Sequence, residues 1–181
     1  MNQDLTTRTI WSKAGISGIA LGAVSGAFMF IGQATGSIGS PVVSTLLSLL
    51  LWLAKFAGCI WLMMFFMKKL CSEFGEATNT DTFKFGMATA LLSALIYSAI
   101  SLANILFISP DLFSEQMSAA IQTYSSMLDS NSMAMLEKME DSYPQISFFS
   151  NLIYCFLYGT VLSAILSRNI PARDPFANFE K

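Results

Sequence analysis

The chain contains no histidine, and charged residues make up only 12% of its 181 residues. Soluble domains carry about twice that share of charge. The three cysteines, Cys59, Cys71 and Cys155, are widely spaced and form no CxxC pair, which argues against a disulfide framework or a zinc site. The formal net charge of −2 provides no basic field for nucleic acid. We therefore expect no metal ion, no cofactor and no nucleic-acid partner.

The sequence also lacks the motifs of common enzymes. It has no P-loop, no GxSxG, no HExxH and no pair of carboxylates inside an apolar run. Glu76 and Asp81 lie in a polar segment beside lysines and are typical of ordinary loop residues. We expect no catalytic residues and a protein that is not an enzyme.

Apolar residues are abundant instead: they make up 54% of the chain, and the mean hydropathy is +0.55. Four runs, residues 14–31, 42–67, 85–108 and 147–166, approach or exceed the 20 or so helical residues that cross a bilayer core. The first resembles a signal peptide but exceeds the usual length of a signal core, so we expect a retained helix. A backbone in lipid must satisfy its own hydrogen bonds. The sequence predicts an all-α integral membrane protein, a bundle of four transmembrane helices in one domain, 1–181.

Lysine and arginine are distributed asymmetrically around these runs. Eight of the ten basic residues fall in the two termini and in the connection between the second and third runs. The connection at residues 33–41 holds none, and the connection at 109–146 holds only Lys138. Basic residues stay on the cytoplasmic side of a membrane. We therefore expect both termini, including the tail 168–181, to be cytoplasmic.

The connection between the third and fourth runs is acidic, and its apolar residues recur at helical spacing. Pro110 suits the first turn of a helix, and a second short helix is expected at Met133–Glu140, before Pro144. We predict an amphipathic helical hairpin at about 110–141, outside the cytoplasm. Methionines that pack on lipid or on the bundle, or that bind a flexible apolar partner, are concentrated there: Met117, Met127, Met133, Met135 and Met139.

Small and polar residues recur at steps of three and four along each run, so each set occupies one helical face. In lipid, such faces turn toward other helices. Gly18, Gly22 and Gly26 predict close helix packing, either within the chain or in a homodimer. The four sets are Gly18, Gly22, Gly26, Met29 and Gln33; Ser44, Ser48, Trp52, Lys55 and Cys59; Ser93, Tyr97, Ser101 and Asn104; and Ser147, Asn151, Tyr154 and Tyr158.

Lys55 is the one charged residue inside a run. It lies roughly 18 Å from the nearer end of its helix, too far for its side chain to reach either surface. A charge at the bilayer centre costs about 2.5–3.5 kcal/mol. A neutral amine, a hydrated cavity, an anion from a lipid or a partner helix, or bonds to helix carbonyls would relieve this cost. If the polar faces converge, they predict an anion-binding cavity lined by Lys55, Tyr97, Ser101, Asn104, Asn151, Tyr154 and Tyr158.

Several segments together resemble one family. They are the glycine-rich first run (GISGIALGAVSG), the start of the third run (NTDTFKFGMATALL), the segment SPDLFSEQM and the tail element Asp174–Pro175–Phe176. In order and spacing the chain resembles the bacterial inner-membrane family called domain of unknown function 4199 (DUF4199). The resemblance implies the cytoplasmic membrane of a Gram-negative bacterium and a role alongside membrane-associated glycosyltransferases. It implies no activity and no catalytic residue.

We expect a non-enzymatic accessory or scaffold subunit of a membrane complex. Its expected partners are membrane lipids and either another membrane protein or a second copy of the chain. The alternative is a small carrier that binds an anionic lipid head group or solute at Lys55, for which lipid-linked phosphate is the natural ligand because a buried cation favours a strong acceptor.

Overall fold

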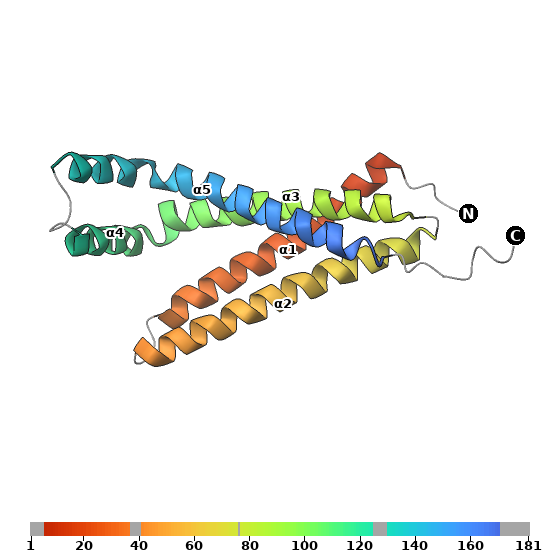
Figure 1. Ribbon diagram of the computed structural model, residues 1–181, viewed down its shortest axis with the longest axis horizontal. Helices are drawn as coiled ribbons and strands as arrows, with labels where there is room; N and C mark the ends of the chain where they lie inside the picture. The colour runs from red at the N-terminus through yellow and green to blue at the C-terminus, as the bar shows by residue number, and fades with distance from the viewer. Residues whose placement is uncertain (1–5, 37–40, 76, 125–129, 171–181) are drawn as a thin grey trace, which may run out of the picture.

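The computed structural model describes residues 6–36, 41–75, 77–124 and 130–170, and within them it is all-helical (Figure 1). The elements are α1 (Thr7–Gly36), α2 (Pro41–Glu73), α3 (Asn79–Ala103), the π-helical turn η1 (Asn104–Ile108), α4 (Pro110–Tyr124) and α5 (Ser130–Leu166). Four helices, namely α1, α2, α3 with η1, and α5, are long and apolar enough to cross a membrane. The predicted all-helical fold with four long apolar helices is confirmed, and each helix extends beyond the apolar run that predicted it.

The helix α3 is the centre of the molecule. It packs extensively against α1 on one side and α5 on the other, whereas α2 packs mainly on α1. Figure 1 shows the α1–α2 hairpin, the first arm, close to the second arm of α3, η1, α4 and α5 at the end where the termini lie. The arms diverge toward the opposite end, where the end of α1 and the beginning of α2 lie away from α4.

The glycine stripe of α1 is the contact surface with α3. A Cβ atom added to Gly22 would lie 2.8 Å from the Cβ of Ile96, and one added to Gly18 would lie 2.7 Å from the Cβ of Leu92. Gly26 faces Ile100 one turn further along. Only glycine allows the two backbones to approach this closely. Of the two arrangements that the spacing allowed, the structure uses the stripe within the chain, so this face is not available as a dimer seam.

The contact between α3 and α5 also depends on small residues. A Cβ atom at Gly159 would lie 2.5 Å from the Cβ of Ala90. At the end near the termini, Thr78 caps α3 in a capping box with Asp81. The Asn79 Nδ2 atom donates hydrogen bonds to two carbonyl oxygens at the end of α5, at 2.6 Å and 3.2 Å. The beginning of α3 is therefore fastened to the end of α5.

The buried apolar core lies in the same half of the molecule. Its members come from the beginning of α1, the end of α2, the first half of α3 and the segment that follows α5. Phe85, Met63 and Met67 are the largest fully buried apolar side chains. The outer faces of α2 and α5 leave large apolar side chains uncovered, as expected of helices that contact lipid. The two arms are thus joined from the core as far as the Gly26–Ile100 contact and separate beyond it.

The predicted short helix at Met133–Glu140 is not an independent element: α5 begins at Ser130 and continues through Pro144 to Leu166. A proline inside a helix costs about 3 kcal/mol, which is why a break was expected there. The rings of Phe113 and Tyr143 stack with centroids 4.2 Å apart, and this contact holds α5 beside α4. Residues 125–129, and the side chains of the five predicted methionines, lie outside the described part.

Candidate functional site

A pocket of about 160 Å³ lies between the arms, next to the core. All four long helices contribute to its wall. Lys55, Cys59 and Trp52 come from α2, Tyr97 and Ser93 from α3. The remaining polar and aromatic contributors are Ser25 of α1, Phe56 of α2, and Tyr154, Cys155 and Tyr158 of α5. The site therefore exists only when both arms are assembled.

Lys55 is half-buried in this pocket, near the middle of α2. At 1.5 Å per residue it lies about 21 Å from Pro41 and about 27 Å from Glu73. Its Nζ atom lies 4.4 Å from the centroid of the Tyr97 ring, a cation–π contact between the arms. Within the described ranges no carboxylate pairs with Lys55, since the ion pair found there joins Lys13 to Glu73. The Lys55 amine thus lies over a ring and, in the part of the chain that the structure describes, beside no carboxylate.

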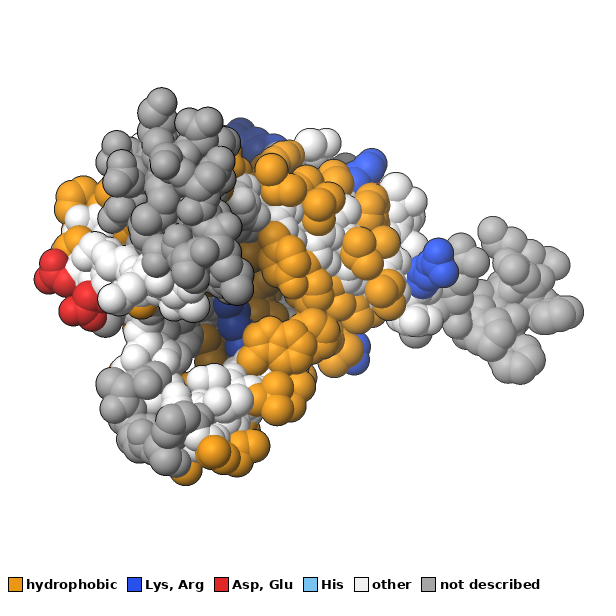
Figure 2. All heavy atoms as spheres, turned by 60° about the vertical axis from the view of Figure 1, so that its left-hand side comes forward, with side chains coloured by type: hydrophobic (Ala, Val, Ile, Leu, Met, Phe, Trp, Pro, Cys, Tyr) orange, Lys and Arg blue, Asp and Glu red, His pale blue; other side chains and the backbone are white. Residues whose placement is uncertain are grey.

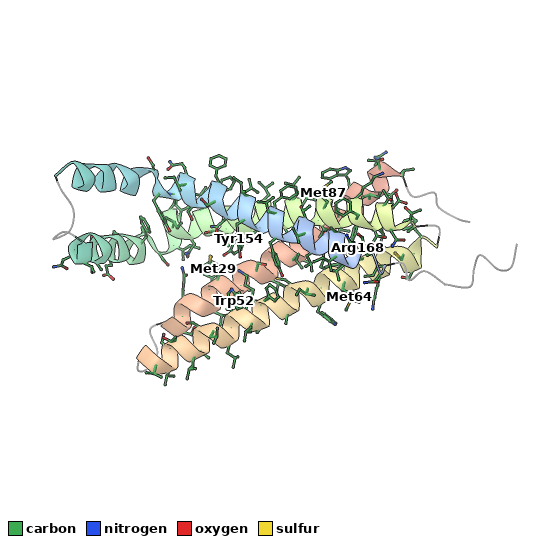
Figure 3. The ribbon with its side chains drawn as sticks, in the orientation of Figure 1. Met29, Trp52, Met64, Met87, Tyr154 and Arg168 are labelled. Carbon is green, nitrogen blue, oxygen red and sulfur yellow. The ribbon has the colours of Figure 1, made fainter. Side chains whose placement is uncertain are left out.

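Aromatic rings line the side of the pocket where α2 faces α5. Trp52 stacks on Phe56 with centroids 5.6 Å apart, and Phe56 contacts the ring of Tyr158 at 5.4 Å. Figure 3 shows Trp52 on α2 and Tyr154 on α5, on either side of the space between the arms. Both side chains are largely exposed, Trp52 at 57% and Tyr154 at 71%. They form the rim of the pocket, and Lys55 lies further inside.

Hydroxyl and thiol groups supply the other polar atoms. The Ser25 hydroxyl lies 3.7 Å from the Cys59 sulfur across the α1–α2 contact. The hydroxyl oxygen of Tyr158 is buried and has no hydrogen-bond partner among the described residues. Unpaired polar atoms in a pocket represent unused hydrogen-bonding capacity. A phenol can donate one hydrogen bond, but the Tyr158 oxygen is closed to solvent.

Of the residues predicted from the sequence, Lys55, Tyr97, Tyr154 and Tyr158 line this pocket. The other three do not. Asn151 donates hydrogen bonds to the hydroxyls of Ser101 and Ser147, at 3.2 Å and 3.4 Å, in a separate polar cluster between α3 and α5. Asn104 begins η1, and its buried Oδ1 has no partner in the described part of the chain. Ser101 and Asn151 lie outside the pocket wall because they bond to each other across the α3–α5 contact.

The sequence prediction missed several members of the wall, among them Leu21, Ser25, Phe56 and Cys155. Two of them carried a usable signal. Ser25 is four residues after Leu21, which places both on one side of α1 beside the glycine stripe. Phe56 is four residues after Trp52. Cys155 belongs to none of the four polar faces predicted from the sequence, and only the approach of α5 to α2 brings it to the pocket.

The pocket opens toward the end where the arms diverge. Figure 2 shows that end of the molecule, with a hollow between the arms and a basic side chain deep inside it. Lys55 is the basic residue in the wall of the pocket. A single cation and tyrosine hydroxyls in one wall suit the binding of an anion. In the part that the structure describes, no three His, Cys, Asp or Glu side chains are grouped to hold a metal ion.

The fold and the pocket define a class: all-helical proteins with four helices able to cross a membrane and a cationic pocket between them. Within that class, the chain belongs to the family described as "Protein of unknown function (DUF4199)", whose model matches residues 16–168. The resemblance stated from the sequence is thereby confirmed, and the tail element at Pro175 lies outside the matched range. Searches of curated proteins and of solved structures return no match.

Proposed function

We propose that this protein is a multi-pass protein of the cytoplasmic membrane of a Gram-negative bacterium and that it binds an anionic group, without catalysis, at Lys55. The observation that carries the proposal is the position of Lys55: mid-helix, in a pocket shared by both arms, and unpaired with any carboxylate of the described residues. An unpaired charge at this depth is costly in a bilayer. A bound anion would offset that cost.

The chemistry of the wall supports an oxyanion as the ligand. An ammonium group donates hydrogen bonds and accepts none. Hydrogen bonds between charged partners are about twice as strong as neutral ones. The hydroxyls of Tyr97 and Tyr154, residues of the same wall, are neutral donors. A phosphate or carboxylate oxygen, which accepts hydrogen bonds, complements these donors.

Native mass spectrometry of the gently extracted protein tests the proposal. The native protein is expected to retain an anionic molecule that Lys55→Met lacks, because methionine keeps the length of the side chain and removes its charge. Lys55→Arg is the matched control and should retain the molecule. Equal retention by Lys55→Met and the native protein would remove Lys55 from the function.

The proposed topology is tested separately. Both termini are expected in the cytoplasm, because eight of ten basic residues flank the membrane on that side. Reporter domains fused to each end should both be active only as cytoplasmic fusions. A terminus that is accessible from outside the cell membrane would contradict the orientation.

A second candidate function is that of an accessory subunit, and the exposed face of α2 favours it. Only 6% of the apolar window of α2 is buried within the chain. A partner helix that lies against α2 beside the gap to α5 and carries a carboxylate near mid-membrane would pair with Lys55. Co-purification of a membrane protein with the native chain, lost in Lys55→Met, would support this candidate over a small anionic ligand.

A further inference from the structure

We propose that the anion is the head group of a phospholipid, which reaches Lys55 sideways between α2 and α5 while its acyl chains remain in the membrane. This inference rests on the proposed function, because it requires an anion at Lys55. It adds the source of the anion and its route. Three features of the pocket carry it: its size, its rim and the weak contact between the two helices that flank it.

The size of the pocket admits a head group and excludes whole lipids. The pocket has a volume of about 160 Å³. Pockets that enclose drug-sized ligands measure about 300–1,000 Å³. A phosphate group fits next to Lys55, whereas acyl chains must stay outside. A ligand with chains therefore needs an opening toward the hydrocarbon phase.

The contact between α2 and α5 provides that opening. These two helices touch each other at few points, whereas α5 packs along α3 and α2 packs along α1. Trp52 and Tyr154 form the rim on the two helices and are largely exposed. The helix faces around the rim present large uncovered apolar side chains, which include Leu49, Leu53 and Leu157. Acyl chains that leave the pocket here meet an apolar surface.

The divergence of the arms provides the polar half of the route. The arms separate at the end opposite the termini, which is the extracytoplasmic end in the proposed topology. In the space-filling view the hollow between them leads to a basic side chain (Figure 2). A head group that enters from the outer leaflet can travel through this hollow while its chains pass between α2 and α5. A free anion without acyl chains would gain no binding energy from the apolar surface around the rim.

Trp52 reports on this site directly. Trp11→Phe and Trp61→Phe together leave Trp52 as the single tryptophan, and phospholipids with brominated acyl chains quench its fluorescence on contact. Brominated phosphatidic acid and phosphatidylglycerol are compared in mixed micelles with brominated diacylglycerol of the same chains, which has no phosphate. We expect Trp52 to be quenched at about tenfold to a hundredfold lower concentrations of the anionic lipids, the ratio that a charged hydrogen bond supplies.

Two matched controls separate site binding from general lipid contact. A protein with Trp61 alone carries its reporter on the same helix, exposed at 59% and away from the pocket wall. Its quenching should not distinguish the lipids. In the Trp52 reporter, Lys55→Met should abolish the preference for anionic lipids and Lys55→Arg should keep it. An equal preference at Trp61 would overturn the inference, because it would come from the lipid layer around the whole protein.

Inorganic phosphate distinguishes failure of this inference from failure of the proposed function. Phosphate binding is measured by equilibrium dialysis with labelled phosphate, for the native protein and Lys55→Met. If phosphate binds in a Lys55-dependent way and Trp52 shows no lipid preference, the lateral route is wrong and the anion site stands. If neither phosphate nor anionic lipid binds, both proposals are wrong. Lys55-dependent quenching by anionic lipid supports both.

Discussion

The glycine contact between α1 and α3 leads to a quantitative prediction for Gly22→Ala. The added methyl group would lie 2.8 Å from both Cβ and Cγ2 of Ile96 and 3.1 Å from the carbonyl oxygen of Ser93. Carbon atoms pack best at about 3.5–4.0 Å, so α1 must move away from α3 by several tenths of an ångström or more. The carbonyl oxygen belongs to the α3 backbone and cannot rotate aside. Overpacking of this kind costs about 1–3 kcal/mol.

Gly15→Ala is the matched control on the same helix, because a Cβ atom at Gly15 meets nothing within 4 Å. Both substitutions raise helix propensity by about 0.8–1.0 kcal/mol. This gain cancels when the two variants are compared. We therefore expect Gly22→Ala to be less stable than Gly15→Ala by about 1–3 kcal/mol, measured by reversible unfolding in mixed micelles with increasing sodium dodecyl sulfate.

Two further measurements complete the test. Ile96→Ala in the Gly22→Ala background removes Cγ2 and leaves Cβ, so it should relieve the overpacking in part. The oligomeric state of Gly22→Ala should not differ from that of the native protein. Equal stability of the two glycine variants would refute the close contact of α1 with α3. A change of oligomeric state without loss of stability would place the stripe at a contact between copies of the chain.

Three other predictions concern single contacts. Tyr97→Leu should lower the free energy of unfolding by about 0.5–2 kcal/mol through the lost cation–π contact, and the loss should vanish in the Lys55→Met background in a double-mutant cycle. Glu73→Gln should lower the free energy of unfolding by at most about 1 kcal/mol, because the ion pair of Glu73 with Lys13 is partly exposed. High salt should reduce this loss. A loss that does not depend on salt would contradict the prediction. Phe113→Ala should speed hydrogen exchange in α4 and leave the unfolding midpoint nearly unchanged, since the stack contributes about 0.5–1.5 kcal/mol locally.

The four long helices were predictable because the length and hydropathy of a run are local properties. The glycine spacing likewise identified a packing face on α1. The spacing did not reveal the partner of that face, because a face accepts any helix of complementary shape. The structure chooses α3, which is not adjacent to α1 in the chain. The small residues Gly159 and Ala90 at the α3–α5 contact were missed, although both belong to stripes of small residues at steps of four: Gly86, Ala90, Ala94 and Ser98 on α3, and Gly159, Ser163 and Ser167 from α5 onward.

The sequence predicted part of the candidate site correctly: four of the seven predicted residues line the pocket. Lys55 was conspicuous as a lone charge in an apolar run, and helical spacing placed Tyr97, Tyr154 and Tyr158 on inward faces. Spacing gives the face of a helix but not its rotation relative to a third helix. Asn151 therefore appeared to belong to the same cavity, although it bonds to Ser101 in a separate cluster. The contact of Phe56 with Tyr158 depends on the angle between the two arms, which the sequence of one helix does not determine.

The pairing of α1 with α3 affects how the helices assemble during synthesis of the chain. The partner of the glycine face of α1 is α3, and the whole of α2 lies between them in the sequence. Ribosomes add about 5–20 residues per second, so α1 waits several seconds for its partner. During that interval the exposed glycines of the first hairpin are free to associate with other newly inserted helices. We therefore expect that biogenesis of this protein needs a factor at the site of membrane insertion. This factor would cover the glycine face of the α1–α2 hairpin until α3 has been inserted.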